Sequence, residues 1–329
     1  MLSSATDACL LRRRYDPTAL VAAHPPRLRH GNKRVAFERA CPPGAVHGGT
    51  IELTRWATAA LPERGAARAV EVEARPGYYD YAGPSEGVWH VNFADPELFV
   101  AYGSALLAQD ELQAVEHPLL GCLREALRAE GQRACTEVDG QATPVLVRGV
   151  ERRVALDTAP TLEDGRVHGL YGNRFAAAAP ATIERALRVL APPTASNLIA
   201  MAAPAGGRGR YTRHQLVDIV TTAYTAFAAA VGESHAAWPG TPVEVVTGFW
   251  GCGAFGGNRR VMTCLQLLAA RLAGVDRVRF HTADEAGRDD FAAGAADLAR
   301  VLATGDASTA AVLDRLAELD HAWGSPNGT

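Results

Sequence analysis

A glycine-rich run near the end of the chain holds the residues best able to do chemistry. Residues 247–258 read TGFWGCGAFGGN, between an expected strand at 243–246 and an expected helix at 258–273. Its five glycines let the backbone approach a ligand and present successive N–H groups, and a helix N-terminus adds a positive dipole. The run lacks the Gly-Lys-Ser/Thr of a P-loop and the spacing of a dinucleotide fingerprint. From these features alone, an anion site and a structural turn are equally good interpretations.

Two neighbouring carboxylates, Asp110 and Glu111, are the second candidate. They follow Gln109 in a segment that reads as helical, after a buried strand expected at 88–94. Adjacent side chains on a helix point about 100° apart, so the two acids can divide the work. One can bind hydroxyl groups while the other transfers protons. Most Asp-Glu pairs are solvated, and without further information a solvated helix face is the better interpretation.

The elements that must position these residues alternate between strands and helices over the C-terminal two thirds. Besides the segments above, we expect strands at 145–147, 197–203 and 275–281, and helices at 50–61, 97–129 with a break at 117–118, 181–190, 212–231, 288–303 and 307–322. This alternation predicts an α/β sheet with helices on its faces. We expect an irregular arm at 1–48, one domain with a helical N-terminal lobe at 49–323, and a disordered tail at 324–329.

Composition narrows the class of protein. The 329 residues are 48% hydrophobic and 21% charged with a net charge of −3, which is typical of a globular protein and argues against a phosphate-binding surface for nucleic acid. No charge-free run reaches about 18 apolar residues and the N-terminus lacks the order of a secretory signal, so we expect a cytoplasmic protein without a membrane partner. Six scattered cysteines without a Cys-x-x-Cys pair predict reduced thiols and no zinc site.

Together, the two candidate segments resemble the poly(ADP-ribose) glycohydrolase family. The run at 247–258 is similar to the family's TGNWGCGAFGGD, residues 91–95 (VNFAD) to its VDFAN, and residues 109–112 (QDEL) to its QEEI. Weaker likenesses extend in pieces from about residue 50 to 303. The resemblance implies a divergent bacterial member with a macrodomain-like mixed sheet flanked by helices, a helical N-terminal extension, and one such domain over 49–323.

The resemblance also implies roles for individual residues. Glu111 matches the catalytic glutamate, Asp110 the neighbouring acid that holds the terminal ribose, and Asp95 a ribose-binding position. The ligand-binding residues implied in this way are Asn92, Asp95, Gln109, Gly248, Trp250, Gly251, Cys252, Gly253, Ala254, Phe255, Gly256 and Gly257. Cleavage of a ribosyl bond needs an acid that protonates the leaving group and then deprotonates water, while a neighbouring carboxylate fixes the ribose hydroxyls. We expect neither a cofactor nor a metal in this chemistry.

The sequence departs from the family where adenine and half of the diphosphate are held. The family has a glycine run before its acids, whereas residues 96–102 read PELFVAY, whose side chains would crowd a phosphate. The family's tyrosine platform corresponds to residues 150–157, which contain no aromatic residue, and only Phe280 is left of a second aromatic motif. Tyr171, Tyr102 and Arg153 are candidates for replacement contacts.

These observations predict a monomeric glycosidase that hydrolyses a ribosyl bond of an ADP-ribosyl or related NAD-derived substrate, either a small molecule or protein-linked. Two alternatives stay open: a non-catalytic ADP-ribose-binding module, and a biosynthetic hydrolase of NAD metabolism that acts on a small NAD-derived metabolite. Retention of Glu111 favours an enzyme, because a pure binder has little need of a carboxylic acid at the scissile bond.

Overall fold

One eight-stranded sheet organises the chain. The computed structural model describes residues 8–65, 69–163, 165–204 and 206–326. The strands lie, in spatial order, as β1 (Cys9–Tyr15), β2 (Ile51–Trp56), β7 (Val145–Leu156), β8 (Leu187–Ala202), β4 (Val88–Ala94), β9 (Glu244–Thr247), β10 (Arg277–His281) and β3 (Glu71–Arg75). The five strands from β8 to β3 are parallel, and β7, β2 and β1 continue the sheet antiparallel. A small hairpin of β5 (Glu137–Val138) and β6 (Gln141–Ala142) stands apart. The predicted mixed sheet is confirmed.

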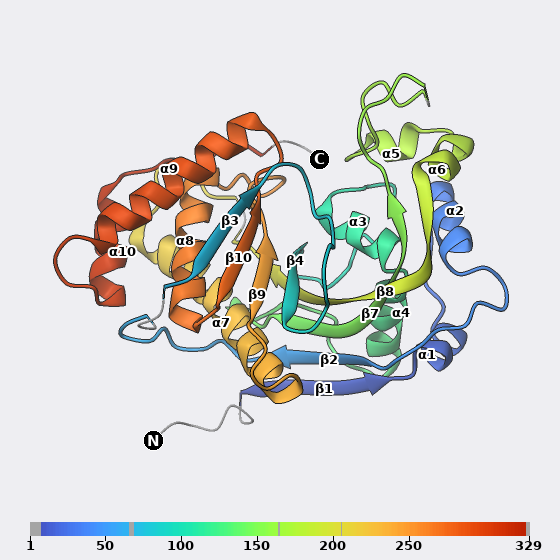
Figure 1. The fold of residues 1–329 in the computed structure, drawn as a ribbon, viewed down its shortest axis with the longest axis horizontal. Helices are drawn as coiled ribbons and strands as arrows, with labels where there is room; N and C mark the ends of the chain where they lie inside the picture. The colour runs from blue at the N-terminus through green and yellow to red at the C-terminus, as the bar shows by residue number, and fades with distance from the viewer. Residues whose placement is uncertain (1–7, 66–68, 164, 205, 327–329) are drawn as a thin grey trace.

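Helices cover both faces of this sheet (Figure 1). One group is α7 (Arg213–Ala237), α8 (Arg259–Ala273), α9 (Glu285–Leu302) and α10 (Thr309–Glu318). The other is α1 (Pro17–Ala23), α2 (Gly31–Ala40), α3 (Gln109–Glu116), α4 (Leu119–Ala129), α5 (Arg174–Ala177) and α6 (Pro180–Ala186). Alternate residues of the central strands enter separate cores, with Leu146 and Ile199 in one and Val147 and Leu198 in another. This period of two makes the strands apolar on both sides, as a sheet covered on both faces requires.

The N-terminal part differs from the expectations. The helix expected at 50–61 is wrong: Ile51–Trp56 forms β2, which pairs with β1 and β7 on either side. The described part of the arm at 1–48 is not irregular, because it supplies the edge strand β1 and the helices α1 and α2. β1 carries arginines, and Arg12 forms ion pairs with Glu52 and Glu233. Charged side chains are common on edge strands, and they hide the strand from a search for apolar alternation.

Other boundaries shift. Residues 97–108 are not helical, since α3 begins at Gln109. The expected helix at 181–190 ends at Ala186 and continues as β8, and β7 runs on to Leu156 rather than stopping at 147. Residues 327–329 of the expected tail lie outside the described residues. Residues 324–326 lie against the glycine-rich run, where a Cβ on Gly256 would come within 2.9 Å of Pro326.

The long helix α7 is a core element. Its 25 residues are long and apolar enough to cross a membrane by length and composition, the only such helix in the described parts of the chain. However, 56% of its most apolar window is buried. It contributes Ile219, Ala223 and Phe227 to the core shared with β4, β8 and α8. Its apolar composition is therefore accounted for by packing inside the fold.

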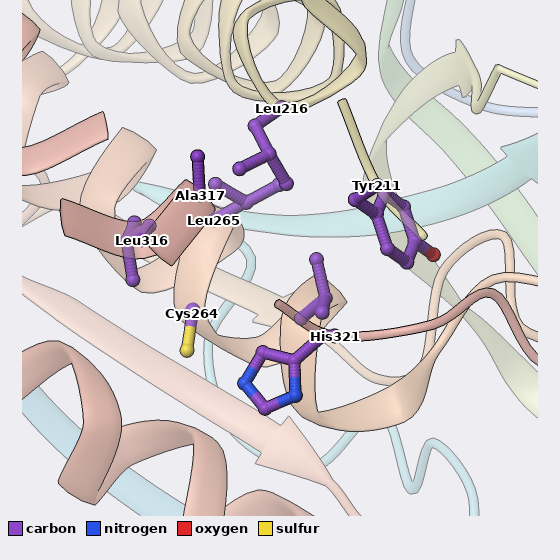
Figure 2. A pocket seen from close by; sticks show the side chains of 8 residues that line it. Tyr211, Leu216, Cys264, Leu265, Leu316, Ala317 and His321 are labelled. Atoms are coloured by element: carbon purple, nitrogen blue, oxygen red, sulfur yellow. The ribbon is translucent and has the colours of Figure 1, made fainter. Parts of the chain in front are cut away.

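A small cavity of about 280 Å³ lies between α7, α8 and α10. Figure 2 shows the side chains of Leu216, Leu265 and Leu316 around it, together with Cys264 and His321. The two polar groups are already engaged: the thiol donates to the carbonyl of Gly294 at 2.9 Å, and the imidazole lies 3.3 Å from the Asp297 carboxylate. The cavity is a packing gap that offers no group for chemistry.

Candidate active site

The expected acids and the glycine-rich run meet at the carboxyl ends of the parallel strands. A cavity of about 680 Å³ opens there. Asp95 follows β4, Ala203 follows β8, and the glycine-rich run follows β9. Ligands bind at this edge in open α/β sheets because the loops after neighbouring parallel strands converge there. The cavity is lined by Phe93, Ala94, Asp95, Leu106, Ala108, Gln109, Asp110, Glu111, Tyr171, Ala203, Trp250, Gly251, Gly253, Ala254 and Phe255.

The first turn of α3 is fixed to the end of β4. The Gln109 side-chain amide accepts a hydrogen bond from the N–H of Phe93 at 2.7 Å and donates to the carbonyl of Val91 at 3.1 Å. Oε2 of Glu111 accepts from the N–H of Ala108 at 2.8 Å, which satisfies a backbone donor that the helix start leaves open. Gln109 therefore acts as a clamp, and Glu111 keeps one carboxylate oxygen for the cavity.

Asp110 is held in place by a hydrogen bond from Asn92. The Asn92 side-chain N–H₂ donates to Oδ1 of Asp110 at 3.0 Å and to Oε1 of Gln113 at 2.8 Å. Asp110 and Glu111 are 6% and 4% exposed. Burial and the charge of Glu111 raise the pKa of Asp110, while the Asn92 hydrogen bond and the charge of Lys33 lower it. The net effect is a raised pKa, so Asp110 retains a proton more readily than an isolated acid does.

The glycine-rich run is anchored at its start. The buried Trp250 donates its indole N–H to the carbonyl of Met201 at 2.9 Å, and Gln266 donates to the carbonyl of Gly248 at 2.9 Å. Gly251 has φ +75°, and a Cβ there would lie 2.6 Å from Cβ of Ala203. The N–H of Gly257 closes the loop on the carbonyl of Gly251 at 2.8 Å. Only glycine combines this backbone conformation with this close approach.

Four backbone N–H groups of that loop remain available to a ligand. Among the described residues, nothing accepts a hydrogen bond from the N–H groups of Gly251, Gly253, Ala254 and Phe255. The start of α8 is different, because Oδ1 of Asn258 accepts from the N–H groups of both Arg260 and Val261. The expectation that the helix N-terminus adds to an anion site is therefore corrected: its first donors are capped, and free donors lie in the loop.

A second, aromatic cavity of about 1090 Å³ adjoins the first. Phe93, Gln109, Tyr171 and Gly253 line both. The rings of Tyr78 and Tyr171 stack with centroids 5.9 Å apart at 15°. The remaining aromatic side chains of its wall are Tyr79, Tyr81, Phe249 and His281. Such a cavity suits a planar ring, because stacked aromatic groups bind the face of another ring.

His281 lies in the wall of this second cavity. Its side chain is 5% exposed, and within the described residues neither ring nitrogen has a hydrogen-bond partner. Burial lowers its pKa to about 4, so the ring is neutral at pH 7. A neutral imidazole has one donor and one acceptor. Both ring nitrogens are themselves buried, so they are unpaired polar atoms behind the wall of the cavity.

The structure brings together most residues that the sequence singled out. Nine line the first cavity: Asp95, Gln109, Asp110, Glu111, Trp250, Gly251, Gly253, Ala254 and Phe255. Gly248 and Cys252 line the second. Three line neither cavity: Asn92 lies behind Asp110, and Gly256 and Gly257 close the loop from behind. Burial raises the pKa of the Cys252 thiol, so this cysteine is not activated as a nucleophile.

Two expectations about the altered regions are wrong. Residues 96–102 do not crowd the first cavity, because Leu98 and Phe99 are fully buried in the core against α4. Tyr102 and Arg153 supply no replacement contact: the tyrosine hydroxyl donates to Glu125, and the guanidinium donates to the carbonyl of Ala40 at 2.7 Å. Tyr171, the third candidate, does line both cavities.

Sequence reasoning missed several residues. It gave no role to the three tyrosines of the run YYDY at residues 78–81, although this cluster beside Gly77 was a visible signal. It also gave no role to Lys33, which lies behind Glu111. Across the described ranges, no group of three or more His, Cys, Asp or Glu side chains has an arrangement that could hold a metal ion.

Comparison with known proteins finds a family likeness in the C-terminal half of the chain. Residues 181–289 match the family model described as "Poly (ADP-ribose) glycohydrolase (PARG), Macro domain fold". This segment is similar to the macro domain of the poly(ADP-ribose) glycohydrolase family. The match includes the glycine-rich run and confirms the resemblance drawn from it. Asp110 and Glu111 lie outside the matched range, so their roles rest on the geometry above.

Solved poly(ADP-ribose) glycohydrolase structures are similar to this chain only remotely. That of Thermomonospora curvata has 17% identity over 88% of each chain and a TM-score of 0.41. The same enzyme bound to the inhibitor ADP-HPD has 17% identity, covers 88% of this chain and 86% of that one, and has a TM-score of 0.39. The Deinococcus radiodurans enzyme in complex with ADP-ribose has 14% identity, covers 92% and 98%, and has a TM-score of 0.40. At these values the solved structures lend no detail to the site.

Proposed function

We propose that this protein is a glycosidase that hydrolyses a ribosyl bond of an ADP-ribosyl or related NAD-derived substrate. One observation carries the proposal: the buried pair Asp110 and Glu111 shares a cavity with a glycine loop that presents free N–H donors. The loop offers hydrogen bonds to the oxygens of a diphosphate. The acids offer the proton transfers that a glycosidic bond needs. The family segment supports the same class of substrate.

In the proposed reaction, Glu111 is the acid and then the base. Its Oε2 is held by the N–H of Ala108, so Oε1 faces the reacting atoms. It gives its proton to the leaving oxygen as the bond to the anomeric carbon breaks. It then takes a proton from the water whose oxygen bonds to that carbon, which restores the acid. Asp110, held by Asn92, accepts hydrogen bonds from the ribose hydroxyls.

The aromatic cavity indicates that the proposed substrate carries a planar ring. A planar group can pack against Tyr78 and Tyr171. The aromatic side chains come from segments other than residues 150–157, where the family's adenine platform belongs and from which only Leu156 lines this cavity. This observation favours a second candidate, hydrolysis of a small NAD-derived metabolite whose ring differs from adenine. Both candidates use the same acids and the same loop.

The test combines binding with product analysis. Purified protein is titrated with ADP-ribose by calorimetry and incubated separately with poly(ADP-ribose) and with NAD, and products are identified by mass spectrometry. We expect release of a ribosyl product that falls by about 10²–10⁴ in Glu111→Gln. Glu38→Gln, on the exposed face of α2, is the matched control and keeps the parent rate.

The outcomes separate the candidates. Product from poly(ADP-ribose) supports the family activity, and product from NAD alone supports the small-molecule enzyme. ADP-ribose binding without release from any donor would instead indicate a non-catalytic binding module. Equal turnover by Glu111→Gln and the parent would overturn the assignment of the acid.

A further inference from the structure

We infer that Lys33 is a positioning residue whose buried ammonium group sets the charge of the Asp110–Glu111 pair. This inference rests on the proposed function, since it concerns the same two acids. It assigns a catalytic purpose to the N-terminal segment that carries α2, which lies outside the range matched by the family model.

The placement of Lys33 is unusual for a lysine. It is the only lysine of the chain, and its side chain is 2% exposed. Nζ lies 3.5 Å from the carbonyl oxygen of Glu111 and 5.3 Å from the centre of the Phe175 ring. Its neighbour Asn32 donates to the carbonyls of Phe175 and Ala178 at 2.7 and 2.9 Å, which fixes the start of α2 against this wall. The ammonium is therefore held directly behind the carboxylate helix.

The fold itself does not need a cation at this position. In the described residues no carboxylate forms an ion pair with Lys33, and its surroundings include the apolar side chains of Ala36, Phe37, Ala114 and Val115. A buried charge whose nearest partners are a backbone carbonyl and an aromatic ring, and not a paired carboxylate, is costly to the folded state. A methionine would occupy the same space without that cost. The charge is better explained by what it does to the neighbouring acids.

The charged groups that face Lys33 come from α3. Asp110 and Glu111 are the two whose charges act on it, and burial opposes them, so its pKa is lowered to about 8. The other packed elements contribute groups that are engaged elsewhere: His30 contacts the Phe175 ring, and the Tyr102 hydroxyl donates to Glu125. The balance of charge around the acids is therefore set by the Lys33 ammonium, the two carboxyl groups themselves and Asp95, whose charge also raises the pKa of Asp110.

The charge of the Lys33 ammonium also changes the pKa of Asp110. Burial and the charge of Glu111 raise the pKa of Asp110, and the nearby positive charge of Lys33 lowers it. Lys33 thereby keeps one negative charge in the pair at neutral pH. One acid can then donate a proton while the other remains an anion that holds ribose.

The first experiment reads Lys33 directly. Because the chain has one lysine, selective ¹³C and ¹⁵N lysine labelling gives one side-chain signal that needs no assignment. We expect it to titrate near pH 8 in the intact protein and at a lower pH in Asp110→Asn, because the substitution removes a charge that stabilises the cation. A signal that titrates at the ordinary lysine value and does not move in Asp110→Asn would overturn the inference.

The second experiment separates positioning from structural support. In Lys33→Met, we expect the acidic limb of kcat/KM to move upward by about one pH unit, which is about a tenfold loss of rate on that limb. We also expect unchanged or increased resistance to urea, and Lys33→Arg should restore the limb because it restores the charge. A purely structural lysine predicts a less stable Lys33→Met with an unmoved limb, which would refute the inference.

The lysine signal also distinguishes this inference from the proposed function. It requires no substrate, so coupling between Lys33 and Asp110 is measurable even if no ribosyl donor is hydrolysed. Coupling without any turnover would overturn the glycosidase and support the charge balance. Turnover without coupling would support the glycosidase and overturn the role of Lys33.

Discussion

Replacing Gly251 with alanine should strain the glycine-rich loop by an amount that the structure fixes. The residue has φ +75°, a conformation that costs a residue with a Cβ about 1–2 kcal/mol. The new Cβ would lie 2.6 Å from Cβ of Ala203 and 3.2 Å from Cε of Met262. Relief of that overlap requires movement of packed groups, which costs about 1–3 kcal/mol. Together these costs predict a loss of about 2–5 kcal/mol in the free energy of unfolding.

The assay is urea unfolding followed by tryptophan fluorescence, since Trp250 lies beside the substituted position. We expect a lower midpoint with an unchanged slope, because the surface exposed on unfolding stays the same. Calorimetric titration with ADP-ribose should also show weaker binding, since the displaced loop carries the free N–H groups. A domain stability of about 5–15 kcal/mol leaves the variant folded for this measurement.

Gly232→Ala provides the matched control. Gly232 lies inside α7, and a Cβ added there meets nothing within 4 Å. The same chemical change should therefore stabilise the protein by about 0.5–1 kcal/mol. If Gly251→Ala matched this control, or lost less than about 1 kcal/mol, the reasoning about loop strain would be refuted.

Three further predictions concern other groups. Glu111→Ala should lose about 1 kcal/mol of stability because it removes the acceptor for the Ala108 N–H, whereas Glu111→Gln keeps an acceptor and should unfold with the parent in a thermal scan. Asp297→Asn should lower the free energy of unfolding by about 1–3 kcal/mol, because the buried carboxylate pairs with Arg260. Asp314→Asn, at an exposed ion pair, should change it by less than about 0.5 kcal/mol. Equal urea midpoints for the two variants would contradict this prediction. Stability should fall as the pH is lowered from 6.5 to about 3, because burial lowers the pKa values of three imidazoles to about 3 or 4, and over this range the unfolded chain binds protons that the folded chain does not. These imidazoles are His90, His117 and His281. The expected slope is at most about 1.4 kcal/mol per pH unit for each, and urea midpoints that stay constant on acidification would exclude it.

Elements that carry their own signals were predictable from the sequence. The strand at 88–94 is an apolar run between breakers, and the helix that follows Asn258 has a capping residue and an apolar face. β1 and β2 were not, because β1 is rich in arginine and β2 is too short for its periodicity to exclude a helix. Their conformation depends on pairing with β7, which is distant in sequence.

The residues of the site also fall into those that the sequence revealed and those that it did not. The acids and the glycine loop were recognisable because carboxylates are typical of proton transfer and glycine-rich loops are typical of phosphate binding. The aromatic cavity was not, because it joins Tyr78, from the loop after the edge strand β3, to Tyr171, from the segment between β7 and β8. Lys33 was equally hidden: a lone lysine in an expected surface arm gives no sign that it will be buried behind α3.

The burial of the single lysine also allows separation of α2 from α3 to be measured by chemical modification. An acylating reagent can reach the Lys33 ε-amino group, which is 2% exposed, only when α2 separates from α3. The rate of mass gain at this one residue therefore measures how often the N-terminal segment detaches while the rest of the fold stays intact. Comparing that rate with and without a bound ribosyl ligand shows how strongly the occupied cavity holds the two segments together.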